Sequence, residues 1–266
     1  MDTQNKYRRI VIKVGSNVLT RDDGRPDTTR ISALVDQVAR LHRAGTEVIL
    51  VSSGAVASGH SILGQRAGKL DSVAARQLFS AVGQVKLLNR YYDLFNEYGI
   101  VCGQVLTTKE SLSTRRQYLN QRNCMEVMLA NGVIPIVNEN DTVSVAEFGI
   151  GDNDTLSAIV ATSVHADLLV LLSDIDGLYT ADPHKNPDAA RIELVPEITE
   201  EILRLADGKG SELGTGGMKT KLTAAQIVTR AGTDMIIANG AEVEKLYALL
   251  DGRSIGTRFL GKKADI

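Results

Sequence analysis

The sequence predicts an α/β fold, an αβα sandwich with a mainly parallel central sheet. Short apolar runs rich in Val, Ile and Leu alternate along the chain with longer segments in which apolar residues recur at helical spacing. Runs this apolar are typical of strands whose two faces are both covered by helices, as in parallel sheets. Their alternation with helical segments therefore favours a doubly wound sandwich.

The first two strands and the helix between them have clear boundaries. Residues 10–14 form an apolar run that ends in a tight turn. A helix is expected over residues 28–43, because a threonine can cap its N-terminus and apolar residues line one of its faces. Gly45 ends this helix, and the next apolar run predicts a strand over residues 47–51.

The middle of the chain repeats this alternation at greater length. A long helical segment is expected over residues 71–98, and Gly83 is a candidate break within it. A strand over residues 100–106, a helix over residues 115–130 and a strand over residues 133–137 follow.

The last part of the chain has the same pattern, interrupted by a proline-rich stretch. The predicted strands span residues 168–172 and 234–238, and the predicted helices span residues 154–164, 197–205, 218–231 and 242–250. Residues 177–183 are expected to form a turn or hairpin over the site. No repeat, low-complexity tract or Gly/Ser linker divides the chain, so we expect one domain over residues 1–266.

Composition excludes several classes of function. Lys and Arg number 30 and Asp and Glu number 32, so the chain lacks the basic excess of a nucleic-acid-binding protein. Cys102 and Cys124 cannot form a disulfide framework, which favours a reducing, cytoplasmic location. The polar N-terminus resembles no signal peptide, and the apolar runs are too short to span a membrane.

Polar and glycine-rich clusters follow five of the predicted strands. These clusters are residues 13–16, 52–54, 138–141, 173–174 and 239–240. Ligands of parallel α/β folds bind at the carboxyl ends of the strands. The clusters therefore predict a binding site at one edge of the sheet.

Residues 214–221, with the sequence Gly-Thr-Gly-Gly-Met-Lys-Thr-Lys, precede a predicted helix. Glycines let backbone N–H groups approach phosphate oxygens, and the N-terminus of the helix favours an anion. The segment is not a Walker A motif, because Met218 stands where that motif requires glycine and no strand precedes it. A phosphate site and a surface loop with a helix cap both remain open.

Lys13 and Asp154 are the charged residues whose positions most suggest chemistry. A lysine at the end of an apolar strand is costly to bury without an anion, so Lys13 either meets one at the sheet edge or is solvated. Asp154 follows Asp152 and Asn153 just before a helix, and a cap needs only one of these side chains. Asp154 is thus a candidate to accept from two lysines, Lys13 and Lys221.

The remaining polar clusters have both a functional and a structural interpretation. Residues 138–141 offer amides and carboxylates to a polar substrate, or form an Asx turn. Residues 52–54 form an anion nest or a strand–helix turn. The four histidines are dispersed without metal-ligand spacing. Phosphoryl transfer needs positioning and charge neutralisation more than a catalytic base, so it suits this inventory.

Six segments, taken in order, resemble the amino acid kinase family, and the resemblance extends from about residue 8 to 260. They are residues 11–16, 51–55, 137–141, 151–154, 177–183 and 214–221. The resemblance implies the carbamate kinase-like version of the sandwich. Asn-Glu-Asn-Asp and Gly-Thr-Gly-Gly-Met favour the branch of the family that acts on glutamate over those that act on carbamate, uridylate or N-acetylglutamate.

This resemblance implies transfer of the γ-phosphoryl group of ATP to the γ-carboxylate of L-glutamate, giving L-glutamyl 5-phosphate, the first step of proline biosynthesis. By analogy, Lys13 and Lys221 neutralise the phosphates and Asp154 orients both lysines. The implied glutamate-binding residues are Ser53, Gly54, Asp141 and Asn153. The implied ATP-binding residues are Lys13, Ser173, Asp174, Thr215, Gly216, Gly217, Met218, Lys219, Thr220 and Lys221. Mg²⁺ is expected to be carried mainly by the nucleotide phosphates, with no metal site of the protein's own.

The resemblance also divides the domain and suggests partners. Residues from about 1 to 165 would mainly bind substrate, and those from about 166 to 260 would mainly bind ATP. Expected partners are a second copy of the chain in a dimer or tetramer, proline as a feedback inhibitor, and a glutamyl phosphate reductase that receives the labile product; no nucleic acid or membrane is expected. Relatives often carry a further PUA domain, which is not expected here. The rivals are another acyl or phosphate acceptor and a catalytically silent amino-acid sensor.

Overall fold

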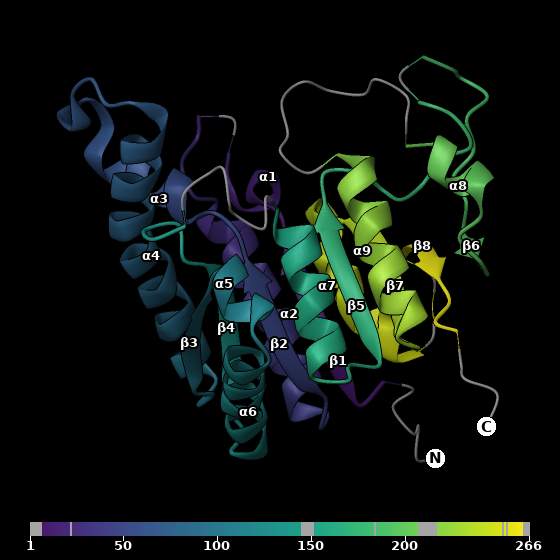
Figure 1. Cartoon of the computed structure of the whole chain (residues 1–266), viewed down its shortest axis with the longest axis horizontal. Coiled ribbons are helices and arrows are strands. Elements are labelled where there is room, and N and C mark those ends of the chain that lie inside the picture. The colour runs from purple at the N-terminus through teal and green to yellow at the C-terminus, as the bar shows by residue number, and fades with distance from the viewer. Residues whose placement is uncertain are drawn as a thin grey trace.

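The computed structural model describes residues 7–21, 23–144, 152–183, 185–206, 217–251, 253 and 255–262. Within them, one sheet of eight strands carries helices on both of its faces (Figure 1). The strands are β1 (Arg9–Val14), β2 (Glu47–Ser52), β3 (Cys102–Thr107), β4 (Ile134–Glu139), β5 (Leu168–Ser173), β6 (Leu194–Val195), β7 (Asp234–Asn239) and β8 (Gly256–Phe259). The αβα sandwich expected from the sequence is therefore confirmed.

The helices of this sandwich include two long ones, α2 and α4. The α-helices are α1 (Ser16–Leu19), α2 (Thr28–Arg43), α3 (Ala55–Leu63), α4 (Ser72–Glu97), α5 (Lys109–Ser113), α6 (Arg115–Ala130), α7 (Asn153–Ser163), α8 (Glu200–Arg204) and α9 (Met218–Arg230). Two 3₁₀ segments, η1 (Gly64–Ala67) and η2 (Gly240–Asp251), complete the set.

The strand order is β3-β4-β2-β1-β5-β7-β8-β6, so β1 lies in the middle of the sheet. All neighbouring strands run parallel except β7 and β8, which pair antiparallel. The carboxyl ends of β1, β2, β4, β5 and β7 therefore meet at one edge. This is the arrangement in which the predicted polar clusters become neighbours.

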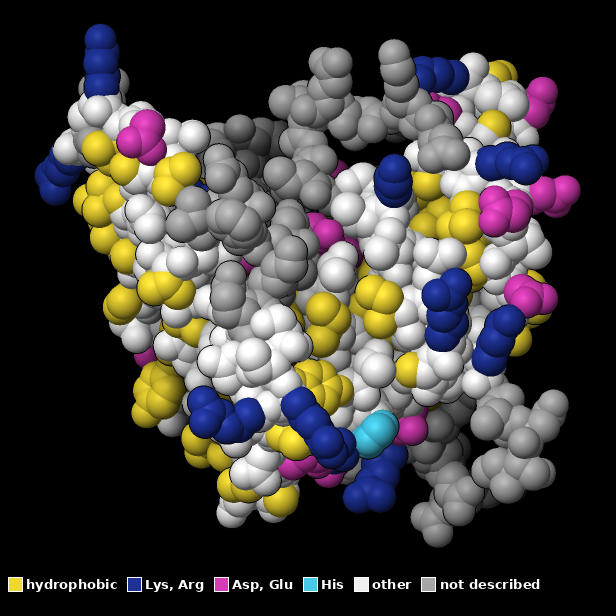
Figure 2. Space-filling model, viewed as in Figure 1, with side chains coloured by type: hydrophobic (Ala, Val, Ile, Leu, Met, Phe, Trp, Pro, Cys, Tyr) yellow, Lys and Arg dark blue, Asp and Glu magenta, His cyan; other side chains and the backbone are white. Residues whose placement is uncertain are grey.

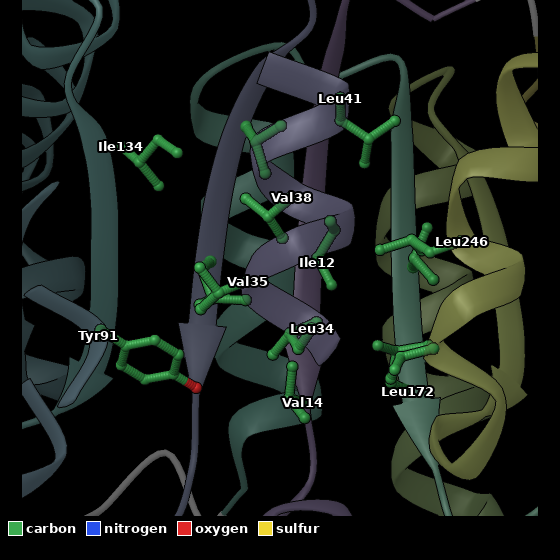
Figure 3. Close-up of a cluster of buried hydrophobic side chains, with 14 of the residues drawn as sticks. Ile12, Val14, Leu34, Val35, Val38, Leu41, Tyr91, Ile134, Leu172 and Leu246 are labelled. Carbon is green, nitrogen blue, oxygen red and sulfur yellow. The ribbon is translucent and has the colours of Figure 1, made fainter. Parts of the chain in front are cut away.

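Side chains of β1 alternate between the two faces of the sheet. Ile10, Ile12 and Val14 join the core beneath α2, α4 and η2. Ile12 and Val14 lie against the apolar face of α2 (Figure 3). Val11 joins the opposite core, beneath α6, α7 and α9. Since alternate residues share a face, Lys13 lies on the same face as Val11 and is directed toward α7 and α9.

Four details differ from the sequence-based expectations. Helix α4 is continuous through Gly83, because the glycine serves close packing and not a break: a Cβ there would lie 1.8 Å from the carbonyl oxygen of Ala55 in α3. The segment predicted over 242–250 is a 3₁₀ helix with a kink at Glu242. The segment predicted over 197–205 is the shorter α8. The short elements were not predicted, because segments this short carry little pattern of their own: they are α1, α3, η1, α5, β6 and β8.

Residues 177–183 were expected to form a turn or hairpin. Tyr179 does pair antiparallel with Arg191, and the backbone N–H of Thr180 donates to the carbonyl of Ala190 at 2.9 Å. His184 of this region lies outside the described residues.

Candidate active site

Three buried charged side chains meet where β1, α7 and α9 converge. Nζ of Lys13 lies 2.5 Å from Oδ1 of Asp154, and Nζ of Lys221 lies 3.1 Å from Oδ2 of the same carboxylate. The hydroxyl of Thr220 also donates to that Oδ2, at 2.9 Å. Asp154 is fully buried, while Lys13 and Lys221 are 7% and 3% exposed.

Local structure explains how these residues come together. Lys13 is the penultimate residue of the central strand and lies on the face covered by α7 and α9. Asp154 and Lys221 both lie in the first turns of those helices. Asp152 caps α7 by accepting from the N–H of Thr155 at 2.7 Å. Because Asp152 fills the capping role, the Asp154 carboxylate is available to the lysines.

The electrostatics of this cluster favour an anion. Burial by itself opposes ionisation of Asp154, but the ammonium groups of Lys13 and Lys221 outweigh it and hold the pKa of Asp154 below its usual value. Two cations around one carboxylate leave a positive charge in a site with little water. A phosphate chain would supply the missing negative charge.

A second group of side chains lies at the ends of β2 and β4. Nδ2 of Asn153 donates to Oγ of Ser53 at 2.7 Å and to Oδ1 of Asn138 at 3.2 Å. Nδ2 of Asn138 in turn donates to Oε1 of Gln84 on α4 at 3.0 Å. Gly54, with φ of 101°, adopts the left-handed conformation that starts α3 directly after Ser53. The chain of amides fixes the orientation of Asn153.

Asp141, just after β4, is held by a residue from α4. Nε and Nη2 of Arg76 lie 2.9 and 2.7 Å from Oδ1 of Asp141. Glu139 is nearby, with its Oε2 4.0 Å from Nη2 of Arg76. Both carboxylates are buried, and two acidic side chains therefore lie beside the single guanidinium of Arg76.

The end of β5 supplies a further acid. The carboxylate of Asp174 accepts from Nδ2 of Asn17 at 3.0 Å and from the hydroxyl of Ser173 at 2.9 Å. Partial burial raises its pKa, but these hydrogen bonds and the charge of Lys221 hold the pKa below the usual value. Asp174 is therefore ionised, and the positive charge of Lys221 helps to stabilise its carboxylate.

The structure separates the members of the predicted glycine-rich segment. Lys221 joins the buried cluster, whereas Lys219 and Gly217 at the start of α9 are exposed and Met218 is half-buried. Thr215 and Gly216 lie outside the described residues, as does Gly151. Sequence reasoning missed Arg76, Gln84 and Asn17, because an isolated polar residue on a helix gives no periodic signal.

The described residues show no metal centre and no membrane-spanning helix. No three His, Cys, Asp or Glu side chains there are grouped closely enough to hold a metal ion. Both cysteines are free thiols. No helix in the described part of the chain combines the length and apolarity needed to cross a bilayer.

Comparison with known proteins shows which family the chain resembles. The model of the amino acid kinase family matches residues 8–239. A glutamate 5-kinase of Bacteroides thetaiotaomicron is 53% identical over 97% of this chain and 71% of its own length. One from Clostridium acetobutylicum is 46% identical over 98% of this chain and 99% of its own.

Solved structures share the fold at low sequence identity. A carbamate kinase from Giardia lamblia bound to AMP-PNP superposes with a TM-score of 0.71 at 18% identity, covering 97% of this chain and 100% of that one. An isopentenyl phosphate kinase gives a TM-score of 0.64 at 19% identity, covering 94% and 99%.

Proposed function

The chain belongs to the amino acid kinase family, and we propose that it is a glutamate 5-kinase, which transfers the γ-phosphoryl group of ATP to the γ-carboxylate of L-glutamate. The observation that carries the chemistry is the buried cluster of Lys13, Asp154 and Lys221. The glutamate 5-kinases at 53% and 46% identity support the choice of acceptor. The product would be L-glutamyl 5-phosphate, the first intermediate of proline biosynthesis.

The proposed reaction uses charge neutralisation instead of a catalytic base. A γ-carboxylate oxygen of glutamate forms a bond to the γ-phosphorus of ATP, and the bond from that phosphorus to the bridging oxygen breaks to release ADP. The nucleophile is already ionised at neutral pH, so no side chain has to remove a proton. Lys13 and Lys221 would stabilise the negative charge that spreads over the phosphoryl oxygens and the leaving group.

Asp154 would act as a positioning residue for both lysines. Each of its two oxygens holds one ammonium group, at 2.5 Å for Lys13 and 3.1 Å for Lys221. Without this carboxylate, two buried like charges would repel each other and shift apart. Its lowered pKa keeps it charged throughout the neutral range.

Glutamate would bind at the ends of β2 and β4. Ser53, Gly54 and Asn153 offer hydrogen-bond groups beside the phosphate cluster, and Asn153 is already oriented by its bond to Ser53. Asp141, farther along, offers a carboxylate to the α-ammonium group.

ATP would bind on the opposite side of the cluster. Ser173, Asp174 and residues 215–221 would contact it, and α9 directs its N-terminus toward the same region as Lys221. Mg²⁺ would take most of its ligands from the nucleotide phosphates. One ionised carboxylate, Asp174, near a phosphate-binding lysine fits such an ion. When bound, the ion would supply further charge neutralisation.

Two parts of the single domain would share the work. Residues from about 1 to 165 supply Ser53, Asp141 and Asn153 for the acceptor, and residues from about 166 to 260 supply Ser173 and Asp174 for the nucleotide. The reacting centre would lie between them, where Lys13 from the first part meets Lys221 from the second.

Self-association is a further part of the proposal. Large apolar side chains are exposed on α4, at Leu78, Val85 and Tyr92, and hydrophobic side chains gather along the left edge of Figure 2. Val127 on α6 is exposed as well. Such surfaces favour contact with another protein, and a second copy of the chain suits them best.

The proposal extends to regulation and location. Proline, the end product of the pathway, would inhibit by competing at the acceptor site. Hand-off to a glutamyl phosphate reductase would protect an acyl phosphate that water hydrolyses readily. The free thiols of Cys102 and Cys124 suit a reducing cytoplasm.

ADP release in a coupled assay tests the proposed function. L-Glutamate, N-acetylglutamate, aspartate, carbamate and UMP are compared as acceptors, with and without proline. A preference for glutamate is expected. A preference for any other acceptor would overturn the substrate, and binding of glutamate without ADP release would instead favour an amino-acid sensor.

A further inference from the structure

Helix α4 contacts the end of β4 and the residues after it at three points. Arg76 binds the carboxylate of Asp141, the side-chain amide of Gln77 donates to the carbonyl of Thr142 at 3.0 Å, and Gln84 accepts from Asn138 at 3.0 Å. The position of Asp141 is thus set by a helix that begins far from it in the sequence. Arg76 is the only charged residue among the three that α4 contributes.

The contact between Arg76 and Asp141 leaves part of the guanidinium available. Nε and Nη2 are directed at Oδ1 of Asp141, and the side chain of Arg76 is 43% exposed. Among the described residues, Nη1 of Arg76 makes no hydrogen bond. A guanidinium has five N–H donors in a planar fork, so a group that holds Asp141 retains donors for a second carboxylate.

Charge at this end of the site matches an amino acid backbone. Asp141 and Glu139 carry two negative charges around the one positive charge of Arg76. The excess negative charge suits an ammonium group, and the exposed part of the guanidinium suits a carboxylate. An α-amino acid presents both groups on one carbon atom.

Connections through the hydrogen-bonded amides place this pair within the acceptor site. Asn138, three positions before Asp141, accepts a hydrogen bond from Asn153, which directly precedes the buried Asp154. One series of hydrogen bonds therefore links two charged groups. The acidic side chains of Asp141 and Glu139 lie at one end of it, and the lysines lie at the other. An acceptor would fit with the carboxylate to be phosphorylated at the lysines and its ammonium group at Asp141 and Glu139.

We propose that Arg76 determines acceptor specificity: its guanidinium fixes Asp141 and also binds the α-carboxylate of the acceptor, whose α-ammonium group binds Asp141. This inference rests on the proposed function, because it assigns a role within the glutamate site. It implies that an acceptor without an α-carboxylate loses the contact with Arg76 and retains the contact with Asp141.

Comparing two acceptors in two proteins tests this role. 4-Aminobutyrate is glutamate without the α-carboxylate, and it retains both the ammonium group and the carboxylate to be phosphorylated. We expect the native chain to prefer glutamate in kcat/KM, and Arg76→Ala to reduce kcat/KM for glutamate about 10- to 100-fold, the range of a charge-assisted hydrogen bond. kcat/KM for 4-aminobutyrate should change far less, and the KM for ATP should stay the same.

The comparison separates recognition from positioning. If Arg76 only positioned Asp141, both acceptors would lose the same factor, and that result would overturn the inference, as would an unchanged preference for glutamate. Arg76→Lys, which keeps the charge but lacks the planar fork, should retain part of the preference. If turnover of 4-aminobutyrate is too slow to follow, calorimetric binding of both acceptors gives the same comparison.

Controls distinguish loss of the Arg76 contact from loss of the fold and from absence of the proposed activity. Lys86→Ala removes a positive charge from an exposed position of the same helix and should leave both acceptors unaffected. Thermal unfolding of each variant shows whether the fold is retained. If the native chain does not phosphorylate glutamate at all, the proposed function fails, whereas active native protein with an unaltered preference in Arg76→Ala overturns the role of Arg76 alone.

Discussion

Lys13 and Asp154 form a buried ion pair with Nζ 2.5 Å from Oδ1, although one residue ends the central strand and the other begins a helix. Removing one partner of a buried pair leaves a charge without compensation, which costs more than the pair contributes. Stability and activity therefore depend on the same few side chains.

Lys221→Ala should lower kcat by orders of magnitude while ATP still binds. The lost ammonium group would stabilise charge that develops only as the phosphoryl group moves, so the transition state suffers more than nucleotide binding. Steady-state kinetics and nucleotide titration measure the two effects. Lys219→Ala, at the exposed position of the same turn, should cost far less. Near-normal turnover of Lys221→Ala would contradict the proposed role.

Asp154→Asn should destabilise the protein and abolish most activity. The amide has the shape of the carboxylate but no charge, so Lys13 and Lys221 would be buried next to each other without an anion. A loss of about 3–5 kcal/mol in the free energy of unfolding is expected for a broken buried pair. Urea denaturation checks this value. A variant as stable as the native chain would show that water already compensates the lysines.

Acid should weaken the native protein through Asp154. The pKa of this carboxyl is lowered in the folded state, so its contribution is complete above the unfolded pKa, near 3.8, and is lost as the pH falls through the lower folded pKa. The free energy of unfolding should therefore decline below about pH 4. Asp154→Asn should show a shallower decline, and parallel curves for the two proteins would argue against this linkage.

Gly83→Ala should destabilise the contact between α3 and α4. The added Cβ would lie 1.8 Å from the carbonyl oxygen of Ala55, so the helices must move apart. A cost of at least about 1–3 kcal/mol is expected from overpacking, despite the better helix propensity of alanine. Asn89→Ala, at an exposed position of α4, is the matched control and should change the free energy of unfolding little. Equal stability of the two variants would refute the steric explanation.

Val85→Glu should shift the protein toward smaller assemblies. Val85 is 61% exposed on α4, and a charge there would oppose burial against a second copy of the chain. Light scattering across a range of concentrations measures the mass, and circular dichroism verifies the fold. An unchanged mass for the variant would mean that the chain associates through another surface or does not associate at all.

Sequence by itself determined the αβα sandwich and the edge of the sheet at which its polar clusters gather. Apolar runs that lack alternation form strands whose two faces are both covered by helices. Parallel strands align their carboxyl ends at one edge of the sheet. Lys13, near the end of such a strand, therefore lies at the edge where the other polar clusters lie. Helices α2 and α6 have the bounds that their periodicity indicated, although Asp27 caps α2 in place of the expected threonine. These features are local, and local patterns record them.

Tertiary structure alone decided which side chains meet. Only packing shows that Asp152 caps α7 while Asp154 holds two lysines, and that Lys221 turns inward while Lys219 stays exposed. Arg76 carries no signal in its own helix, because its partner lies on another element and their contact depends on how α4 docks against β4. Periodicity assigns a residue to a face, whereas the partner across that face follows from long-range packing, which no local pattern encodes.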